Sequence, residues 1–179
     1  MPQSPPPVSP DTKGDIDRIA LLEAEINRLN RADKINSALL EISNAVTTSL
    51  NLDDLYARIH SSLNRLVYTP NFYISIYDRE EQLLNFPYYK DERDDENHDA
   101  IVLFEENSLT GEVILNKKPV FLNKSMLELR SQENRLQGSL PVIWIGVPLI
   151  ARDIVIGIIA VQSYTDPQAF SQKDLDILV

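Results

Sequence analysis

The acidic run at residues 91–99, DERDDENHD, is the most chemically loaded stretch of the chain and could in principle bind a cation. An EF-hand calcium loop takes oxygen ligands at its positions 1, 3, 5 and 12. Oxygen-bearing side chains have that spacing at Asp95, Asn97, Asp99 and Glu106. The same loop needs a glycine at its sixth position, where this chain has Ala100, and a preceding helix, where LLNFPYY is strand-like. We therefore expect a solvated, mobile loop and no metal site.

Catalytic chemistry has few candidate residues. The chain contains no cysteine, which excludes disulfides, thiolate ligands, cysteine nucleophiles and cofactors attached through a thioether. His60 has no acidic or histidine neighbour three or four residues away, so we expect a surface or half-buried side chain and no ligand pair. With no phosphate-binding loop and no nucleophile–base pair, the chain by itself is not expected to be an enzyme. A kinase or cyclase output domain could follow it in a longer protein.

Charge and hydropathy limit the partners. The net charge is −10 and no cluster of lysine or arginine interrupts it, which disfavours nucleic acid and anionic membrane surfaces. No apolar stretch reaches the ~18 to 20 residues that cross a bilayer, and the N-terminus lacks a signal peptide. We expect a cytoplasmic protein with one well-buried domain plus accessory structure.

The N-terminal third is expected to be a tail followed by a long helix. Residues 1–14 are proline-rich and nearly lack core-forming side chains, which predicts disorder. Residues 15–50 form an amphipathic pattern, and the 3-4-3 spacing of a coiled-coil seam occurs at Ile19, Leu22, Ile26 and Leu29. This pattern favours a helix that pairs with a second copy and transmits a signal. The alternative is an amphipathic helix packed on its own domain.

Residues 51–179 read as one mixed α and β domain. A helix starting at Asn51 is followed by a hairpin of FYISIYD and QLLNFPYY, two short helices around the strand PVFLN, and the apolar strands VIWIGVPLI and IVIGIIAVQSY. Alternation in the first hairpin strand places Phe72, Ile74 and Ile76 on one face and three hydroxyl-bearing side chains on the other. The last helix stops within two turns, at Val179, and is interpreted as truncated.

Four segments in this order resemble the GAF domain family, which is related to PAS domains. They are NFYISIYDREEQLLNFPYYKDERD, SLTGEVILNKKPVFLN, IWIGVPLIARDIVIGIIAVQSY and AFSQKDLDIL. The resemblance implies an α+β fold with a central antiparallel sheet. The first, second and last helices would cover one face, and short helices and loops would form a pocket on the other. The acidic run then falls in the family's variable loop, a candidate lid over that pocket.

The chemistries of the family can be compared with this sequence one at a time. Its tetrapyrrole-binding members attach the chromophore through a cysteine, and its methionine sulfoxide reductases use cysteines, so the resemblance implies neither here. Cyclic-nucleotide-binding members carry Asn-Lys, then Phe, three residues and Asp-Glu. This chain has Ser163 and Tyr164, then Phe170, Asp174 and Leu175, so only Phe170 and Asp174 match. Cyclic nucleotide binding stays a weak alternative, and no cofactor is identified.

The resemblance therefore predicts a sensory or regulatory GAF input domain of a sensor histidine kinase, a diguanylate cyclase or a transcriptional regulator. It would act as a homodimer through its N-terminal and exit helices; the alternative is a structural dimerisation module without a ligand. Polar groups placed in an apolar pocket are the usual contacts of a small ligand. The candidates are Tyr73, Ser75, Tyr77, Ser108, Thr110 and Trp144. For each of them, an ordinary role in the core or in helix capping remains equally open.

Overall fold

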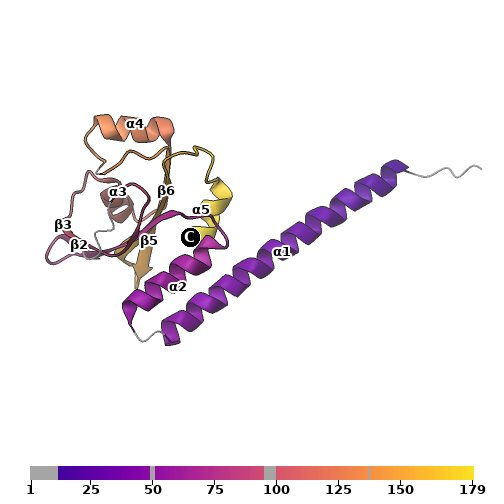
Figure 1. Cartoon of the computed structure of the whole chain (residues 1–179), viewed down its shortest axis with the longest axis horizontal. Helices are drawn as coiled ribbons and strands as arrows, with labels where there is room; N and C mark the ends of the chain where they lie inside the picture. The colour runs from indigo at the N-terminus through magenta and orange to yellow at the C-terminus, as the bar shows by residue number, and fades with distance from the viewer. Residues whose placement is uncertain (1–11, 49–50, 95–99, 137) are drawn as a thin grey trace, which may run out of the picture. The chain divides into compact units, whose positions relative to one another are not determined.

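A computed structural model describes residues 12–48, 51–94, 100–136 and 138–179 (Figure 1). Most of the tail expected at residues 1–14 lies outside these ranges. The elements are, in chain order, α1 (Thr12–Thr48), α2 (Leu52–Asn64), β1 (Asn71–Asp78), β2 (Leu83–Lys90), β3 (Ala100–Leu103), α3 (Leu109–Asn116), β4 (Val120–Asn123), α4 (Lys124–Gln132), β5 (Ile143–Ala151), β6 (Ile154–Ser163) and α5 (Gln172–Leu178).

The chain divides into two compact units, Met1–Ser37 and Ala38–Val179, with the boundary inside α1. In the first unit, the seam residues are each 54 to 55% exposed: Ile19, Leu22, Ile26 and Leu29. In the second unit, Ala38 and Ala45 are buried and Ile42 packs against the core of the domain. Their spacing of four and three residues puts them on one helix face, which is the face that the domain covers.

The sheet has six strands in the order β3-β2-β1-β6-β5-β4, and every neighbouring pair is antiparallel. Strands β1 and β6 lie in the middle, and the short strands β3 and β4 form the two edges. The expected α+β architecture with a central antiparallel sheet is confirmed. The hairpin predicted from FYISIYD and QLLNFPYY is the β1–β2 pair, and the two long apolar strands are β5 and β6.

The two faces of the sheet bury two different clusters. On one face, Phe72 and Ile74 pack with residues of α2 and α5, among them Leu63 and Leu175. On the other face, Tyr73 packs with residues of α3, α4, β4 and β5. Figure 1 shows α2 and α5 on the opposite side of the sheet from α3. The side-chain alternation predicted for the first hairpin strand is therefore confirmed.

A β-bulge separates the two halves of the β1–β2 pair. Ile74 pairs with Tyr88 and Ile76 pairs with Asn85, so two residues of β2 lie opposite the single residue Ser75. One of the two is Pro87, which has no backbone N–H to donate to a sheet and is tolerated inside a strand at such an irregularity. The bulge thus accommodates a proline next to the central strand β1.

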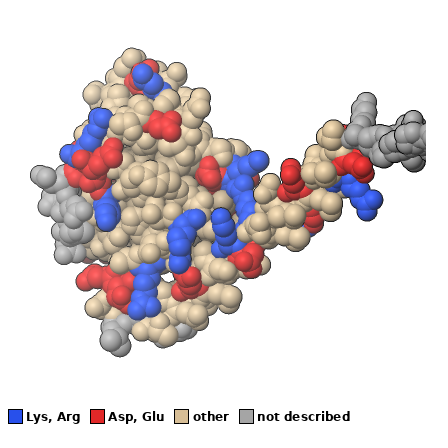
Figure 2. All heavy atoms as spheres, turned by 45° about the vertical axis from the view of Figure 1, so that its right-hand side comes forward, with Lys and Arg blue, Asp and Glu red and all other residues tan. Residues whose placement is uncertain are grey.

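The charged side chains are spread over the surface. On the face drawn in Figure 2, lysine and arginine atoms are interspersed with aspartate and glutamate atoms. Such a mixed surface offers no extended track for a phosphate backbone on that face. Over the described residues, no helix combines the length and the apolar composition that crossing a bilayer requires.

Candidate functional site

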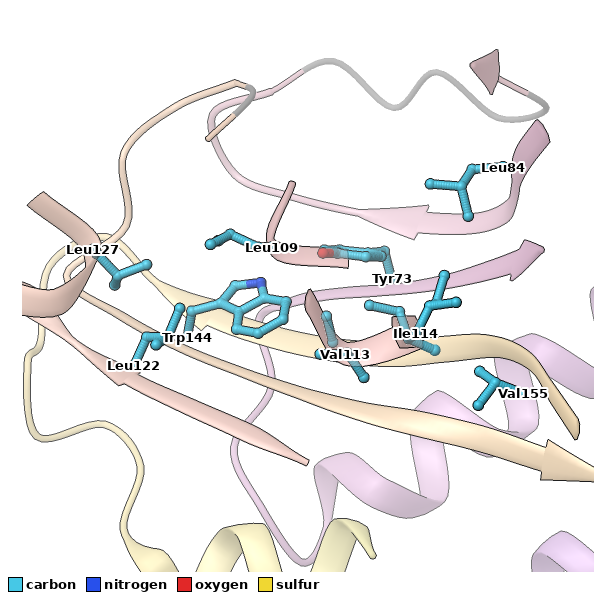
Figure 3. Close-up of a cluster of buried hydrophobic side chains, with 11 residues drawn as sticks. Tyr73, Leu84, Leu109, Val113, Ile114, Leu122, Leu127, Trp144 and Val155 are labelled. Atoms are coloured by element: carbon cyan, nitrogen blue, oxygen red, sulfur yellow. The ribbon is translucent and has the colours of Figure 1, made fainter. Parts of the chain in front are cut away.

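Three of the predicted site residues meet on the sheet face opposite α2 and α5. The hydroxyl of Tyr73 on β1 lies 3.4 Å from Oγ1 of Thr110 on α3. The indole N–H of Trp144 on β5 also lies beside this hydroxyl, and Figure 3 shows the indole nitrogen facing the tyrosine oxygen. Burial raises the pKa of Tyr73, and the polar groups of Thr110 and Trp144 oppose that rise. The hydroxyl of Tyr73 is therefore buried and neutral.

The indole of Trp144 lies flat on this face of the sheet, over Gly146. Its side chain is 1% exposed and, in Figure 3, lies between Tyr73 and the pair Leu122 and Leu127. A Cβ built on Gly146 would lie 2.1 Å from Cη2 of the indole, so the ring lies directly over the glycine. Glycine is the residue that leaves this space open, because any side chain at position 146 would collide with the ring.

Ser75 and Tyr77 extend the same face along β1. Ser75 is 0% exposed, and its Oγ has no hydrogen-bond partner. Tyr77 is partly buried, and its ring centroid lies 4.6 Å from that of Phe104. Buried hydroxyls are nearly always paired, which makes Ser75 the unusual member of the predicted set.

Ser108 has a structural role. It is the N-cap of α3: its Oγ accepts a hydrogen bond from the backbone N–H of Gly111 at 2.9 Å and donates one to the carbonyl of Glu105 at 2.7 Å. Both partners are local, as in an ordinary N-cap. These two contacts of Ser108 do not involve Tyr73.

The start of the acidic run forms a second polar cluster that the sequence analysis missed. The two N–H bonds of Gln162 Nε2 donate to Asp91 Oδ2 at 2.7 Å and to the Tyr164 hydroxyl oxygen at 2.8 Å. The Tyr164 hydroxyl lies 3.0 Å from each oxygen of Asp91 and 3.3 Å from Oδ2 of Asp94. Burial and these carboxylates together raise the pKa of Tyr164 strongly. The hydroxyl therefore stays protonated.

Asp94 also binds the loop between α4 and β5. The backbone N–H of Ser139 donates to Asp94 at 3.0 Å, and the Ser139 hydroxyl donates to it at 2.7 Å. Between the two acids, the Arg93 guanidinium carbon lies 4.6 Å from the ring centroid of Tyr164, a cation–π distance. The expectation of a loosely solvated loop is wrong for Asp91 and Asp94, because buried donors of β6 and a distant loop hold them. Residues 95–99, which carry most of the candidate calcium ligands, lie outside the described ranges.

An ion-pair cluster joins the two short helices above the sheet. Glu112 of α3 accepts two hydrogen bonds from Arg130 of α4, at 3.1 and 2.9 Å, and one from Arg135 at 2.8 Å. Arg130 lowers the pKa of Glu112, and Arg135 contributes to the same effect. This partly buried cluster fixes α3 and α4 relative to one another.

His60 differs from the expectation of a surface or half-buried residue. It is 8% exposed, stacks on Phe72 with ring centroids 4.3 Å apart, and places Nε2 2.8 Å from the carbonyl of Thr69 and Nδ1 3.0 Å from the hydroxyl of Tyr88. The sequence does not predict these contacts of His60, because Tyr88 lies on β2, 28 residues along the chain. Among the described residues, no group of three or more histidine, aspartate and glutamate side chains is placed to hold a metal ion.

Comparison with known families assigns the domain. The family model described as "GAF domain" matches residues 49–179. The chain belongs to the GAF domain family. The family and fold predicted from the sequence are thus confirmed, and GAF domains are typically sensory or regulatory modules. Comparison with curated protein sequences gives no match.

Solved structures with this fold come from functionally different proteins. The GAF domain of an Acinetobacter phosphoenolpyruvate-protein phosphotransferase is 22% identical, with a TM-score of 0.65 over 83% of this chain and 85% of that chain. The corresponding domain from Coxiella burnetii is 14% identical, with a TM-score of 0.65 over 82% and 86%. Free methionine-R-sulfoxide reductase from Neisseria meningitidis is 16% identical, with a TM-score of 0.61 over 80% and 81%. At these identities, the likeness shows a shared fold.

Proposed function

We propose that this GAF domain is a small-molecule-sensing or regulatory input module of a larger signalling protein, such as a sensor histidine kinase, a diguanylate cyclase or a transcriptional regulator. The observation that carries the proposal is the unpartnered Oγ of Ser75, which is fully buried on the face where Tyr73, Thr110 and Trp144 converge. A polar group held in an apolar, aromatic setting is the usual anchor of a small-ligand site.

Signal transmission would use the helices as a homodimer. The seam of α1 exposes apolar side chains at coiled-coil spacing, which a second copy would cover. In the second unit, Glu41 of α1 accepts a hydrogen bond from Ser62 of α2 at 3.1 Å and pairs with Arg65. These contacts would couple a shift of α2 to α1, with α5 as the exit toward an output domain. No catalytic role is proposed for the chain by itself.

One observation favours a ligand-free structural module as the second candidate. Trp144 is almost fully buried over Gly146 and already fills part of the face where a ligand would bind. Cyclic nucleotide binding has less support, because Tyr164 stands where the family motif has lysine and is engaged with two carboxylates. Those acids would repel a phosphate.

Trp144 is the sole tryptophan of the chain, so its fluorescence reports directly on the site. We would purify the protein from its own host, record native mass spectra, and compare the Trp144 emission before and after removal of small molecules by dialysis. A retained molecule whose loss changes the emission supports sensing. A spectrum of the bare chain, with an emission that does not change, favours the structural module.

A further inference from the structure

We propose that the ligand of this site is an uncharged, ring-containing small molecule whose hydrogen-bonding group pairs with the Oγ of Ser75. This inference rests on the sensing function proposed above and specifies its ligand class. Three features of the described residues carry it: the unpartnered hydroxyl, the rings around it and the charges at its edge.

The hydroxyl of Ser75 faces the inside of the aromatic cluster. On β1, Ser75 lies on the same face as Tyr73 and Tyr77, which both belong to this cluster. Its partner on the neighbouring strand β6 is Ile158, another member of the same cluster. At the bulge, Ser75 lies opposite Phe86 and Pro87 of β2. A buried hydroxyl without a partner is unfavourable, and a ligand group that hydrogen-bonds to it removes that cost. Ser75 therefore favours ligands with a donor or an acceptor.

Aromatic side chains dominate the rest of the lining. The ring centroid of Tyr73 lies 5.7 Å from that of Phe86 and 5.8 Å from that of Tyr89. Phe86, Tyr89, Tyr77 and Phe104 are partly buried against the closed core, so they form the more open side of the cluster. Aromatic pairs at these separations are favourable in stacked or tilted geometry, and a planar ligand can join them in the same way.

The charges near the cluster disfavour an anion. Among the described residues, no lysine or arginine is buried. At the edge of the cluster, Asp91 and Asp94 add to the effect of burial in raising the pKa of Tyr89. The cation between these two acids, Arg93, is stacked on the ring of Tyr164. The nearby cations on α4 and after it, Arg130 and Arg135, are bound to Glu112. An anion would lose its hydration without gaining a counter-charge.

A cation is disfavoured for a different reason. The oxygens of Asp91 and Asp94 are engaged by Gln162, Tyr164 and Ser139, so they would have to break existing hydrogen bonds to receive an ammonium group. Within the cluster, the remaining groups are neutral hydroxyls and hydrocarbon, which do not replace the hydration of a cation. An uncharged ring with one polar substituent fits all three features.

Three probes of similar size separate these properties: phenol, with a neutral hydroxyl; benzoate, an anion at pH 7; and toluene, without a polar group. Binding is measured by saturation-transfer NMR of the probe and by the emission of Trp144, on the wild-type chain, on Ser75→Ala and on the control Ser61→Ala. Ser61 is an exposed serine of α2. Removing an unpartnered hydroxyl does not weaken the fold, so Ser75→Ala should remain folded.

We expect phenol to bind wild type and Ser61→Ala equally and Ser75→Ala about tenfold more weakly, which corresponds to one hydrogen bond. Toluene should bind all three chains alike, and benzoate should bind none. Benzoate binding as tight as phenol, or phenol binding unchanged by Ser75→Ala, would overturn the ligand class while leaving a small-molecule site in place. Failure of all three probes overturns the inference; the sensing function itself fails if native mass spectra also show the bare chain.

Discussion

The hydroxyl of Tyr164, which directly follows β6, lies 3.0 Å from both carboxylate oxygens of Asp91, which directly follows β2. This contact joins the beginning of the acidic run to the strand that leads into α5. Gln162 strengthens it by donating to both partners. Side chains thus link the loop next to the aromatic cluster to the segment that leads into α5, and the signalling route proposed above would use this link.

Replacing Tyr164 with phenylalanine should therefore destabilise the domain. The variant Tyr164→Phe removes the donor that faces Asp91 and Asp94, and a hydrogen bond to a charged acceptor contributes about 1.5 to 3 kcal/mol. We expect a loss of about that size in urea unfolding followed by Trp144 emission. The control is Tyr68→Phe, since Tyr68 is 73% exposed. Equal stability of the two variants would show that the contact contributes nothing.

The close approach of Trp144 to Gly146 predicts a second effect. In Gly146→Ala, the new methyl group would meet the indole at 2.1 Å, so the ring must move. Overpacking of this kind costs about 1 to 3 kcal/mol. We expect lower stability and a red-shifted Trp144 emission as the ring becomes more exposed.

A double-mutant cycle with Trp144→Phe provides the control for that effect, with unfolding followed by circular dichroism. The smaller ring relieves the collision, so Gly146→Ala should cost less in the Trp144→Phe background than in wild type. Additive losses in the two backgrounds would mean that the alanine acts through the backbone of β5 and not through the indole.

His60 predicts a pH dependence of stability. Burial lowers the pKa of His60 from 6.5, the hydrogen bond to the Thr69 carbonyl partly opposes this, and Lys90 adds to it. The folded state then binds fewer protons than the unfolded state, so the stabilisation is complete above pH 6.5 and is lost as pH falls below that value. We expect the urea midpoint to decrease between pH 7.5 and pH 5.5. In His60→Gln, which keeps polar groups at this position, the decrease should be smaller; an unchanged slope would rule out His60 as its source.

The sequence predicts the parts of this domain that depend on local pattern. Alternation along FYISIYD correctly separates Phe72 and Ile74 from Tyr73, because adjacent strand residues point to opposite faces. Local patterns of this kind do not predict the hydrogen-bond partners of Asp91 and His60. Gln162 lies 71 residues from Asp91 and Tyr88 lies 28 residues from His60, so only the folded sheet brings them together.

The candidate site shows the same limit. Alternation along the strand places Tyr73 on the predicted pocket face, and the structure brings Thr110 and Trp144, which were candidates by residue type, next to it. Ser108 and Thr110 are both hydroxyl residues at the start of α3, but the hydroxyl of Ser108 caps the helix. Ser75 lies opposite a bulge in β2, and its hydroxyl has no hydrogen-bond partner; both facts depend on the assembled sheet, which no single-strand pattern reveals.

The exposed seam of α1 predicts the oligomeric state. Leu22 and Leu29 are one heptad apart and more than half exposed, so Leu22→Glu together with Leu29→Glu should place charges in a dimer seam. We expect wild type to elute as a dimer in size-exclusion chromatography with light scattering, and the double variant as a monomer. Leu21→Glu is the matched control, because Leu21 is 72% exposed and lies off the 3-4-3 spacing. A wild-type chain that is monomeric with α1 intact would remove the dimer from the proposed signalling route, since no second copy would then cover this seam.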